Sequence, residues 1–135
     1  MLRHFIHEIK VYYEDTDSGG VVYYSNYLKF LERARTELIN FIGLSNKKLL
    51  DEYKILIIVK SCNIDYIKSA KLEDKLQIYS LIESFSKASF IMTQNIKKDE
   101  ELIIKAKLKL VTVNQKGKPI KIPTVLEKNY INKLS

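Results

Sequence analysis

A change of hydrophobic period along the chain is the feature that most limits its possible folds. Residues 25 to 42 carry apolar side chains at helical spacing. The predicted stripe consists of Leu28, Leu31, the adjacent pair Ala34 and Arg35, Leu38 and Ile42. Later segments alternate apolar and polar residues instead, most clearly ELIIKAKLKLVTV at residues 101 to 113. One long helix followed by successive strands with short connections predicts an α+β fold with a largely antiparallel sheet.

A sheet curled around one central helix would bury the apolar face of both elements. Strands are predicted at residues 5–13, 54–68, 75–84, 87–97 and 101–113, with a short helix at 45–52 capped by Ser45 and a last helix at 123–134. One face of the second strand is predicted to hold Leu56, Ile58, Cys62, Ile64 and Tyr66. We expect Cys62 to be a small core residue there. Because no linker or repeat interrupts residues 1 to 135, we expect a single domain.

Composition and charge limit the cellular location and the binding partners that we expect for this protein. No apolar run reaches the roughly 20 residues of a membrane helix, and the N-terminus resembles no secretory leader. A single cysteine is compatible with a reducing compartment, so we expect a cytoplasmic protein. The net charge of +7 comes mostly from lysines spread along the chain. That spread favours a solvated surface over a nucleic-acid partner.

The segment EDTDSGG, residues 14 to 20, joins the first strand to the long helix. Its residue types suit an ordinary turn. A calcium loop is rejected because Gly19 and Asn26 stand where oxygen ligands are needed. A phosphate loop is rejected because the lysine of that motif is missing and carboxylates lie beside the glycines. Besides the turn, one interpretation survives, namely a carboxylate used for chemistry.

The chemical interpretation depends on the helix that begins just after the glycines. A helix start offers free N–H groups and a positive dipole end, which suit a developing oxyanion. Glycines at 19 and 20 leave room for a substrate above the turn. A carboxylate a few residues upstream could then attack a carbonyl or deprotonate water. Acyl transfer or hydrolysis needs these parts and no metal or other cofactor.

The stretch YYEDTDSGGVVYYSNYLKFLERARTE, within residues 11 to 37, resembles the hotdog-fold acyl-CoA thioesterases of the YbgC and 4-hydroxybenzoyl-CoA thioesterase type. NIDYIKSAKLEDKL and SKASFIMTQ continue the resemblance over most of the chain. It implies an antiparallel sheet wrapped around one long central helix. It also implies homodimers that join two sheets edge to edge, or homotetramers of these, with active sites at the dimer interface.

The same resemblance implies roles for residues of the turn and the helix start. Asp17 is expected to act as nucleophile or general base, and Asp15 to be structural. The backbone N–H near Tyr24 is expected to polarise the thioester carbonyl, with Gly20 and Ser25 beside the substrate. YbgC-type members usually have histidine where this chain has Tyr24, so the Tyr24 side chain is either packing or a hydroxyl that contacts substrate.

Further residues are placed by similarity near the two ends of an acyl-CoA. Lys87, Lys118 and Lys121 are expected near the nucleotide, although each is equally explained as solvated surface. Ser89 is expected to approach the acyl end. Glu32 and Arg35, at helical spacing, are expected to pair with each other.

The predicted function is hydrolysis of an acyl-CoA to free acid and CoA. The alternative is a non-catalytic module that binds acyl-CoA or acyl carrier protein. A hotdog hydratase is disfavoured because residues 25 to 42 contain no histidine. The choice between coenzyme A and carrier protein, and between dimer and tetramer, stays open at this point.

Overall fold

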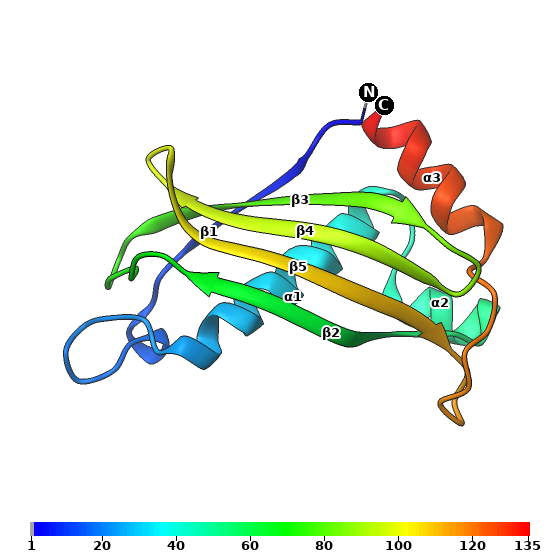
Figure 1. Cartoon of the computed structure of the whole chain (residues 1–135), viewed down its shortest axis with the longest axis horizontal. Coiled ribbons are helices and arrows are strands. Elements are labelled where there is room, and N and C mark those ends of the chain that lie inside the picture. The colour runs from blue at the N-terminus through cyan, green and yellow to red at the C-terminus, as the bar shows by residue number, and fades with distance from the viewer. Residues whose placement is uncertain (1) are drawn as a thin grey trace.

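The computed structural model describes residues 2–135 and contains one antiparallel sheet with three α-helices (Figure 1). The elements are β1 (Phe5–Lys10), the 3-10 turn η1 (Tyr13–Asp15), α1 (Tyr24–Phe41), α2 (Asn46–Tyr53), β2 (Leu56–Tyr66), β3 (Lys75–Phe85), β4 (Ser89–Lys98), β5 (Glu101–Val113) and α3 (Thr124–Leu134). The strand order is β1-β3-β4-β5-β2. Figure 1 shows α1 running along one face of the curved sheet, which confirms the predicted hotdog fold.

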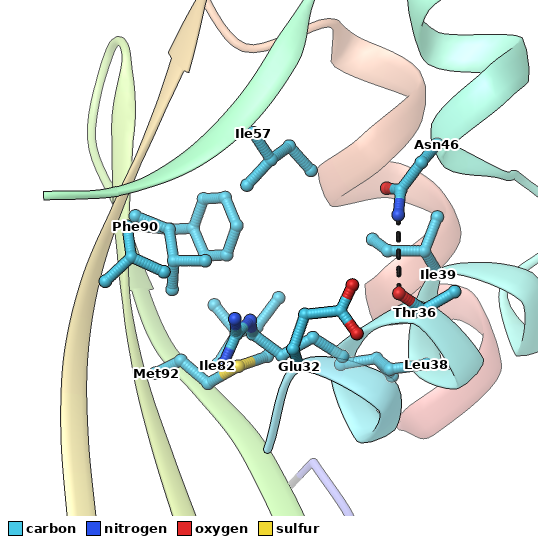
Figure 2. Close-up of a pocket in the computed structure, with 12 residues that line it drawn as sticks. Glu32, Thr36, Leu38, Ile39, Asn46, Ile57, Ile82, Phe90 and Met92 are labelled. Atoms are coloured by element: carbon cyan, nitrogen blue, oxygen red, sulfur yellow. Dashed lines mark hydrogen bonds between the residues drawn. The ribbon is translucent and has the colours of Figure 1, made fainter. Parts of the chain in front are cut away.

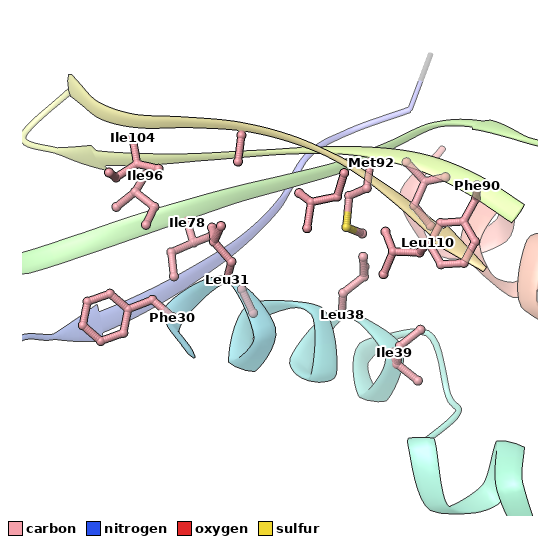
Figure 3. Packing of buried hydrophobic residues seen from close by; sticks show 14 of the residues in the cluster. Phe30, Leu31, Leu38, Ile39, Ile78, Phe90, Met92, Ile96, Ile104 and Leu110 are labelled. Carbon is pink, nitrogen blue, oxygen red and sulfur yellow. The ribbon is translucent and has the colours of Figure 1, made fainter. Parts of the chain in front are cut away.

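The long helix buries the side that faces the sheet. Its buried side chains are those of Tyr27, Phe30, Leu31, Ala34, Leu38 and Ile39. In Figure 3, Leu31 and Leu38 point from α1 toward Ile78 and Met92 of the sheet. The prediction was wrong for Leu28, which is 46% exposed, because the buried face is rotated toward Tyr27. Gly43, with φ of +87°, follows the end of the helix in the left-handed conformation that commonly terminates helices.

Alternation in the central strands matches the sequence pattern. In β5 the inward residues Ile104, Ala106 and Leu108 are buried, while Lys105 and Lys107 are exposed.

Most predicted bounds of helices and strands agree with the structure within two residues. The first strand is the exception because it ends at Lys10 and the chain then turns through η1. Among residues 2–135, no helix is long and apolar enough to cross a membrane.

The face prediction for β2 was wrong, and a β-bulge is the reason. The register between β2 and β5 shifts between Val59 and Ser61. Val59 pairs with Leu110 and Cys62 pairs with Leu108, so these four side chains share the helix-facing side of the sheet. Leu56 and Ile58 therefore lie on the opposite face from Cys62, Ile64 and Tyr66. The extra residue at position 60 reverses the alternation.

Strand β2 lies at an edge of the sheet and is poorly covered. Helix α1 packs mainly over β1 and β3, whereas the short α2 lies against β2. Apolar side chains of β2 are exposed on both faces of the sheet, with Ile58 at 44% and Val59 at 42%. Cys62 is exposed as well, so its prediction as a core residue was wrong. A long edge strand with exposed apolar residues is a site for pairing with another chain.

Candidate active site

The acidic turn before α1 is closed by its own backbone. The Asp17 N–H donates to the Val21 carbonyl at 2.9 Å, and the Gly20 N–H donates to the Asp17 carbonyl at 3.1 Å. Gly20 has φ of +76°, a conformation that other residues rarely adopt. A Cβ on Gly19 would lie 3.3 Å from Asp17 Oδ1. The two glycines thus permit a tight turn around the Asp17 carboxylate.

The Asp17 carboxylate is held by one oxygen and open at the other. Oδ1 accepts hydrogen bonds from the N–H groups of Gly19 at 2.8 Å and Val21 at 3.3 Å. Within residues 2–135, Oδ2 has no hydrogen-bond partner and Asp17 forms no salt bridge. The side chain is exposed. An oriented carboxylate with one free oxygen can accept a proton or attack a carbonyl carbon.

Asp15 behaves differently from Asp17. It is buried, and its Oδ2 accepts the Tyr12 N–H at 2.9 Å. Its carbonyl accepts the Tyr23 N–H at 3.2 Å and the Asn26 side-chain amide at 2.8 Å. These bonds join the turn to the start of α1, in agreement with the structural role expected for Asp15.

The start of α1 presents free backbone donors. No side chain caps the helix at Tyr23. Asn26 N–H bonds to the Tyr23 carbonyl at 2.9 Å, whereas the N–H groups of Tyr24 and Ser25 have no acceptor in the part of the chain that the structure describes. Unpaired N–H groups at the positive end of a helix dipole attract negative charge. Asp17, Gly20, Tyr24 and Ser25 therefore all lie on the turn or on the first residues of the helix that follows it.

The connection after β2 supports this region. Val22 N–H donates to the Ala70 carbonyl at 2.9 Å, and Leu72 N–H donates to the Gly20 carbonyl at 3.0 Å. The Tyr24 ring contacts the Tyr66 ring, with centroids 5.0 Å apart, while the Tyr24 side chain stays 64% exposed. The end of β2 thus lies beside the start of α1.

A cavity of about 90 Å³ lies between α1, α2 and the sheet, and Figure 2 shows its lining. The lining residues are Glu32, Arg35, Thr36, Leu38, Ile39, Asn46, Ile57, Val59, Ile82, Phe90, Met92 and Leu110. Figure 2 shows Phe90 and Ile57 opposite Glu32 and Thr36, so the sheet side of the cavity is apolar and the helix side is partly polar. Neither Asp17 nor Tyr24 of the same chain contributes to this lining.

Arg35 lines the cavity and donates through Nη1 to Gln94 Oε1 at 3.0 Å. Burial lowers the pKa of the Arg35 guanidinium, and the charge of Glu32 partly opposes this. In residues 2–135 no ion pair joins Glu32 to Arg35. The predicted pair is therefore only a longer-range attraction, and Arg35 bonds to the sheet instead.

The other predicted substrate contacts lie at the far end of the same chain. Ser89 pairs with Val111, whereas Tyr66, beside Tyr24, pairs with Ile104. The two β5 partners, Val111 and Ile104, are seven residues apart, which is about 23 Å along a strand. Lys87 is two residues before Ser89 in the chain. Its carbonyl accepts the Ile122 N–H at 2.9 Å, which brings the connection after β5 to the same place.

Lys118 and Lys121 lie in the connection that follows β5, at the same end of the sheet as Ser89. One chain alone does not bring Ser89, Lys87, Lys118 or Lys121 to Asp17.

Sequence reasoning missed two buried polar residues that connect α1 to its surroundings, Tyr27 and Gln94. The signal for Gln94 was present, because it stands between Met92 and Ile96 on an otherwise apolar strand face. A polar residue at such a position needs a hydrogen-bond partner. Tyr27 has no comparable signal, because a tyrosine on a helix stripe is usually packing.

Comparison with known proteins identifies the family of this chain. Residues 11–130 match the thioesterase-like superfamily. The acyl-CoA thioesterase YbgC of Haemophilus influenzae is 38% identical over 120 residues, which cover 88% of each chain.

Solved structures show the same likeness. A probable thioesterase from Bartonella henselae has a TM-score of 0.86 at 31% identity, covering 89% of this chain and 99% of its own. The 4-hydroxybenzoyl-CoA thioesterase of a Pseudomonas species has a TM-score of 0.84 at 24% identity, covering 96% of this chain and 98% of its own, which shows the shared fold. The chain belongs to the thioesterase-like superfamily and is a thioester hydrolase of the YbgC type.

Proposed function

We propose that this protein hydrolyses acyl-CoA thioesters, with Asp17 as nucleophile or general base and the Tyr24 N–H as the main oxyanion donor. One observation carries the proposal: the free Oδ2 of Asp17 lies on the turn that leads directly into the uncapped start of α1. The name of the relative from Haemophilus influenzae supports acyl-CoA as the substrate class.

The chemistry follows from these two parts. Attack on the thioester carbon moves charge onto the carbonyl oxygen, where the N–H groups at the start of α1 stabilise it. Collapse of the tetrahedral intermediate breaks the C–S bond and releases the CoA thiolate. If Asp17 attacks, water then cleaves the resulting anhydride. If Asp17 is a general base, it takes a proton from water as the water attacks. Both routes consume one water and yield the acid and the thiol.

A second copy of the chain completes the proposed site. Pairing of β2 with itself about a two-fold axis is antiparallel, so the Leu56 end of one strand lies beside the Tyr66 end of the other. The cavity, Ser89 and the lysines at the far end of one chain then approach Asp17 of the other. The exposed apolar side chains of β2, including Ile58 and Val59, support this pairing.

The lysines near that end suit the phosphate groups of coenzyme A. Lys87, Lys118 and Lys121 are exposed, so their ammonium groups are accessible to a phosphorylated ligand. Acyl carrier protein presents an acyl group on a similar phosphorylated arm and is a second carrier for the same site.

A thiol-release assay with short, long and aromatic acyl-CoAs tests the proposal. Asp17→Asn keeps the size of the side chain but removes its basicity, and we expect turnover to fall by about 10²–10⁴. Asp51→Asn is the matched control, because Asp51 is an exposed carboxylate of α2 that pairs with Lys47. An Asp17→Asn protein that releases thiol at the parent rate would rule out the proposed role of Asp17. A parent protein that binds acyl-CoA for hours without cleaving it would favour a binding module.

A further inference from the structure

Three hydrogen bonds leave the same face of α1 at intervals of one turn. The Tyr27 hydroxyl accepts the Ala70 N–H at 2.8 Å. The Leu31 carbonyl accepts Gln94 Nε2 at 3.1 Å, and Arg35 Nη1 donates to Gln94 Oε1 at 3.0 Å. Residues 27, 31 and 35 are four apart and therefore lie in line along the helix. We use the name polar stripe of α1 for three groups, namely the Tyr27 hydroxyl, the Leu31 backbone carbonyl and the Arg35 guanidinium.

The polar stripe fixes the position of α1 along its axis. The other contacts between α1 and the sheet are largely apolar, as Leu31 and Leu38 show in Figure 3. Dispersion contacts have little directional preference, whereas hydrogen bonds weaken steeply when their angle or length changes. Gln94 is fully buried and also donates to Ser80 Oγ on β3 at 2.9 Å, so its amide cannot follow a sliding helix without losing bonds.

Ala70 connects the polar stripe to the catalytic turn. Its N–H bonds to the Tyr27 hydroxyl, and its carbonyl accepts the N–H of Val22, two residues before α1 begins. Leu72, two residues further, donates to the Gly20 carbonyl. Residues 70–72 therefore hold both the turn that carries Asp17 and the helix whose start offers the Tyr24 N–H.

We infer that Tyr27 is a positioning residue: its hydroxyl, through Ala70, sets the separation between the Asp17 carboxylate and the N–H groups at the start of α1. This inference rests on the proposed roles of Asp17 and Tyr24. Tyr27 itself is 1% exposed, so it acts through the backbone and does not touch substrate. A misplacement of about 1 Å between reacting groups can lower a rate about 10²-fold.

Tyr130 provides a matched control in the same chain. It is also fully buried, and its hydroxyl accepts a backbone N–H, that of Ile82, at 2.7 Å. Burial is also the main cause that raises the pKa of both Tyr27 and Tyr130. Tyr130 belongs to α3, however, and none of its hydrogen bonds reaches the catalytic turn. Tyr→Phe at either position removes one oxygen and leaves one backbone N–H without its partner.

The test compares Tyr27→Phe with Tyr130→Phe in the full-length protein. Urea unfolding measures stability, and thiol release is measured at a temperature where both variants are folded. We expect similar losses of stability, but a fall in kcat of about tenfold for Tyr27→Phe only, with KM within about twofold of the parent value. That split is expected because the geometry of the reacting groups changes while the contacts to the rest of the acyl-CoA do not. Equal kcat values for the two variants would overturn the inference.

Asp17→Asn in the same series separates this inference from the proposed function. If Asp17→Asn loses turnover and Tyr27→Phe does not, only the positioning role fails. If Asp17→Asn keeps full turnover, both fail. If Tyr27→Phe does not fold, Gln94→Met is compared with Asn129→Leu. Asn129 is the control because its side-chain amide donates to the Ile42 carbonyl at 2.9 Å, near the other end of α1. We expect kcat to fall about threefold for Gln94→Met alone, and an unchanged kcat would overturn the role of the polar stripe.

Discussion

Strands β4 and β2 belong to the same sheet and both are rich in apolar residues, yet their surroundings differ. The helix-facing residues of β4, such as Phe90, Met92 and Ile96, are at most 3% exposed. Those of β2, such as Val59 and Tyr66, are more than 40% exposed. An apolar strand pattern therefore shows which surface must be covered, but not whether the same chain covers it. In β4 the cover is intramolecular, and in β2 we propose that it is a second copy.

The largest expected effect on stability is in β4. Phe90→Ala removes a buried aromatic ring whose neighbours include Phe85 and the cavity wall. We expect the free energy of unfolding to fall by about 3–5 kcal/mol, because transfer and cavity costs add. Urea unfolding measures it. A loss under about 1 kcal/mol would mean that the site collapses freely and that β4 is no better packed than β2.

The double variant Leu56→Lys with Ile58→Lys tests the contrasting strand. Both side chains are already exposed and lie outside the helix-facing surface, so the single chain should tolerate the change. Like charges would face each other across a β2–β2 pair, and we expect dissociation together with at least a tenfold loss of thiol release. Light scattering and the thiol assay measure these effects. Ile6→Lys on β1, the opposite edge of the sheet, is the control. A double variant that is monomeric and fully active would refute the two-chain site.

A smaller effect is expected at Ser45, the cap of α2, which is the helix that lies against β2. Ser45 Oγ accepts the Lys48 N–H at 2.9 Å. Ser45→Ala should lower the free energy of unfolding by about 1 kcal/mol, because a helix donor loses its partner. Thermal unfolding at several protein concentrations measures this. A much larger loss, one that depends on protein concentration, would show that α2 also shapes the contact between chains.

The smallest expected effect is the dependence of stability on high pH that comes from two buried tyrosines, Tyr27 and Tyr130. The pKa values of Tyr27 and Tyr130 are raised above 10 in the folded state, chiefly by burial. The folded state thus holds these protons more tightly than the unfolded state does. Their contribution to stability is complete below pH 10 and is lost as the pH rises through the folded pKa values. Urea unfolding between pH 9 and 11 should show a shallower decline for the Tyr27→Phe, Tyr130→Phe double variant than for the parent protein. Equal slopes would contradict this.

The sequence predicted the order of elements well because hydrophobic period, caps and glycines are local signals. The helix at 25–42, the cap at Ser45 and the alternation of residues 101–113 needed no knowledge of distant contacts. The turn around Asp17 was also recognisable, since acids and glycines before a helix favour a turn, while its chemical use remained one interpretation beside an ordinary turn. The bulge at position 60 was not, because residues 55 to 59 are apolar without a break and so give no alternation whose reversal could be recognised.

By itself, then, the sequence determined an antiparallel sheet around one helix and a carboxylate placed before that helix. The tertiary structure decided which surfaces remain bare and how the parts of the site are held. It left β2 uncovered, placed Ser89 and the lysines at the far end from Asp17, and joined α1 to the turn through Tyr27 and Ala70. The physical reason is range: period and capping act over a few residues, whereas these contacts connect segments that meet only when the whole chain has folded.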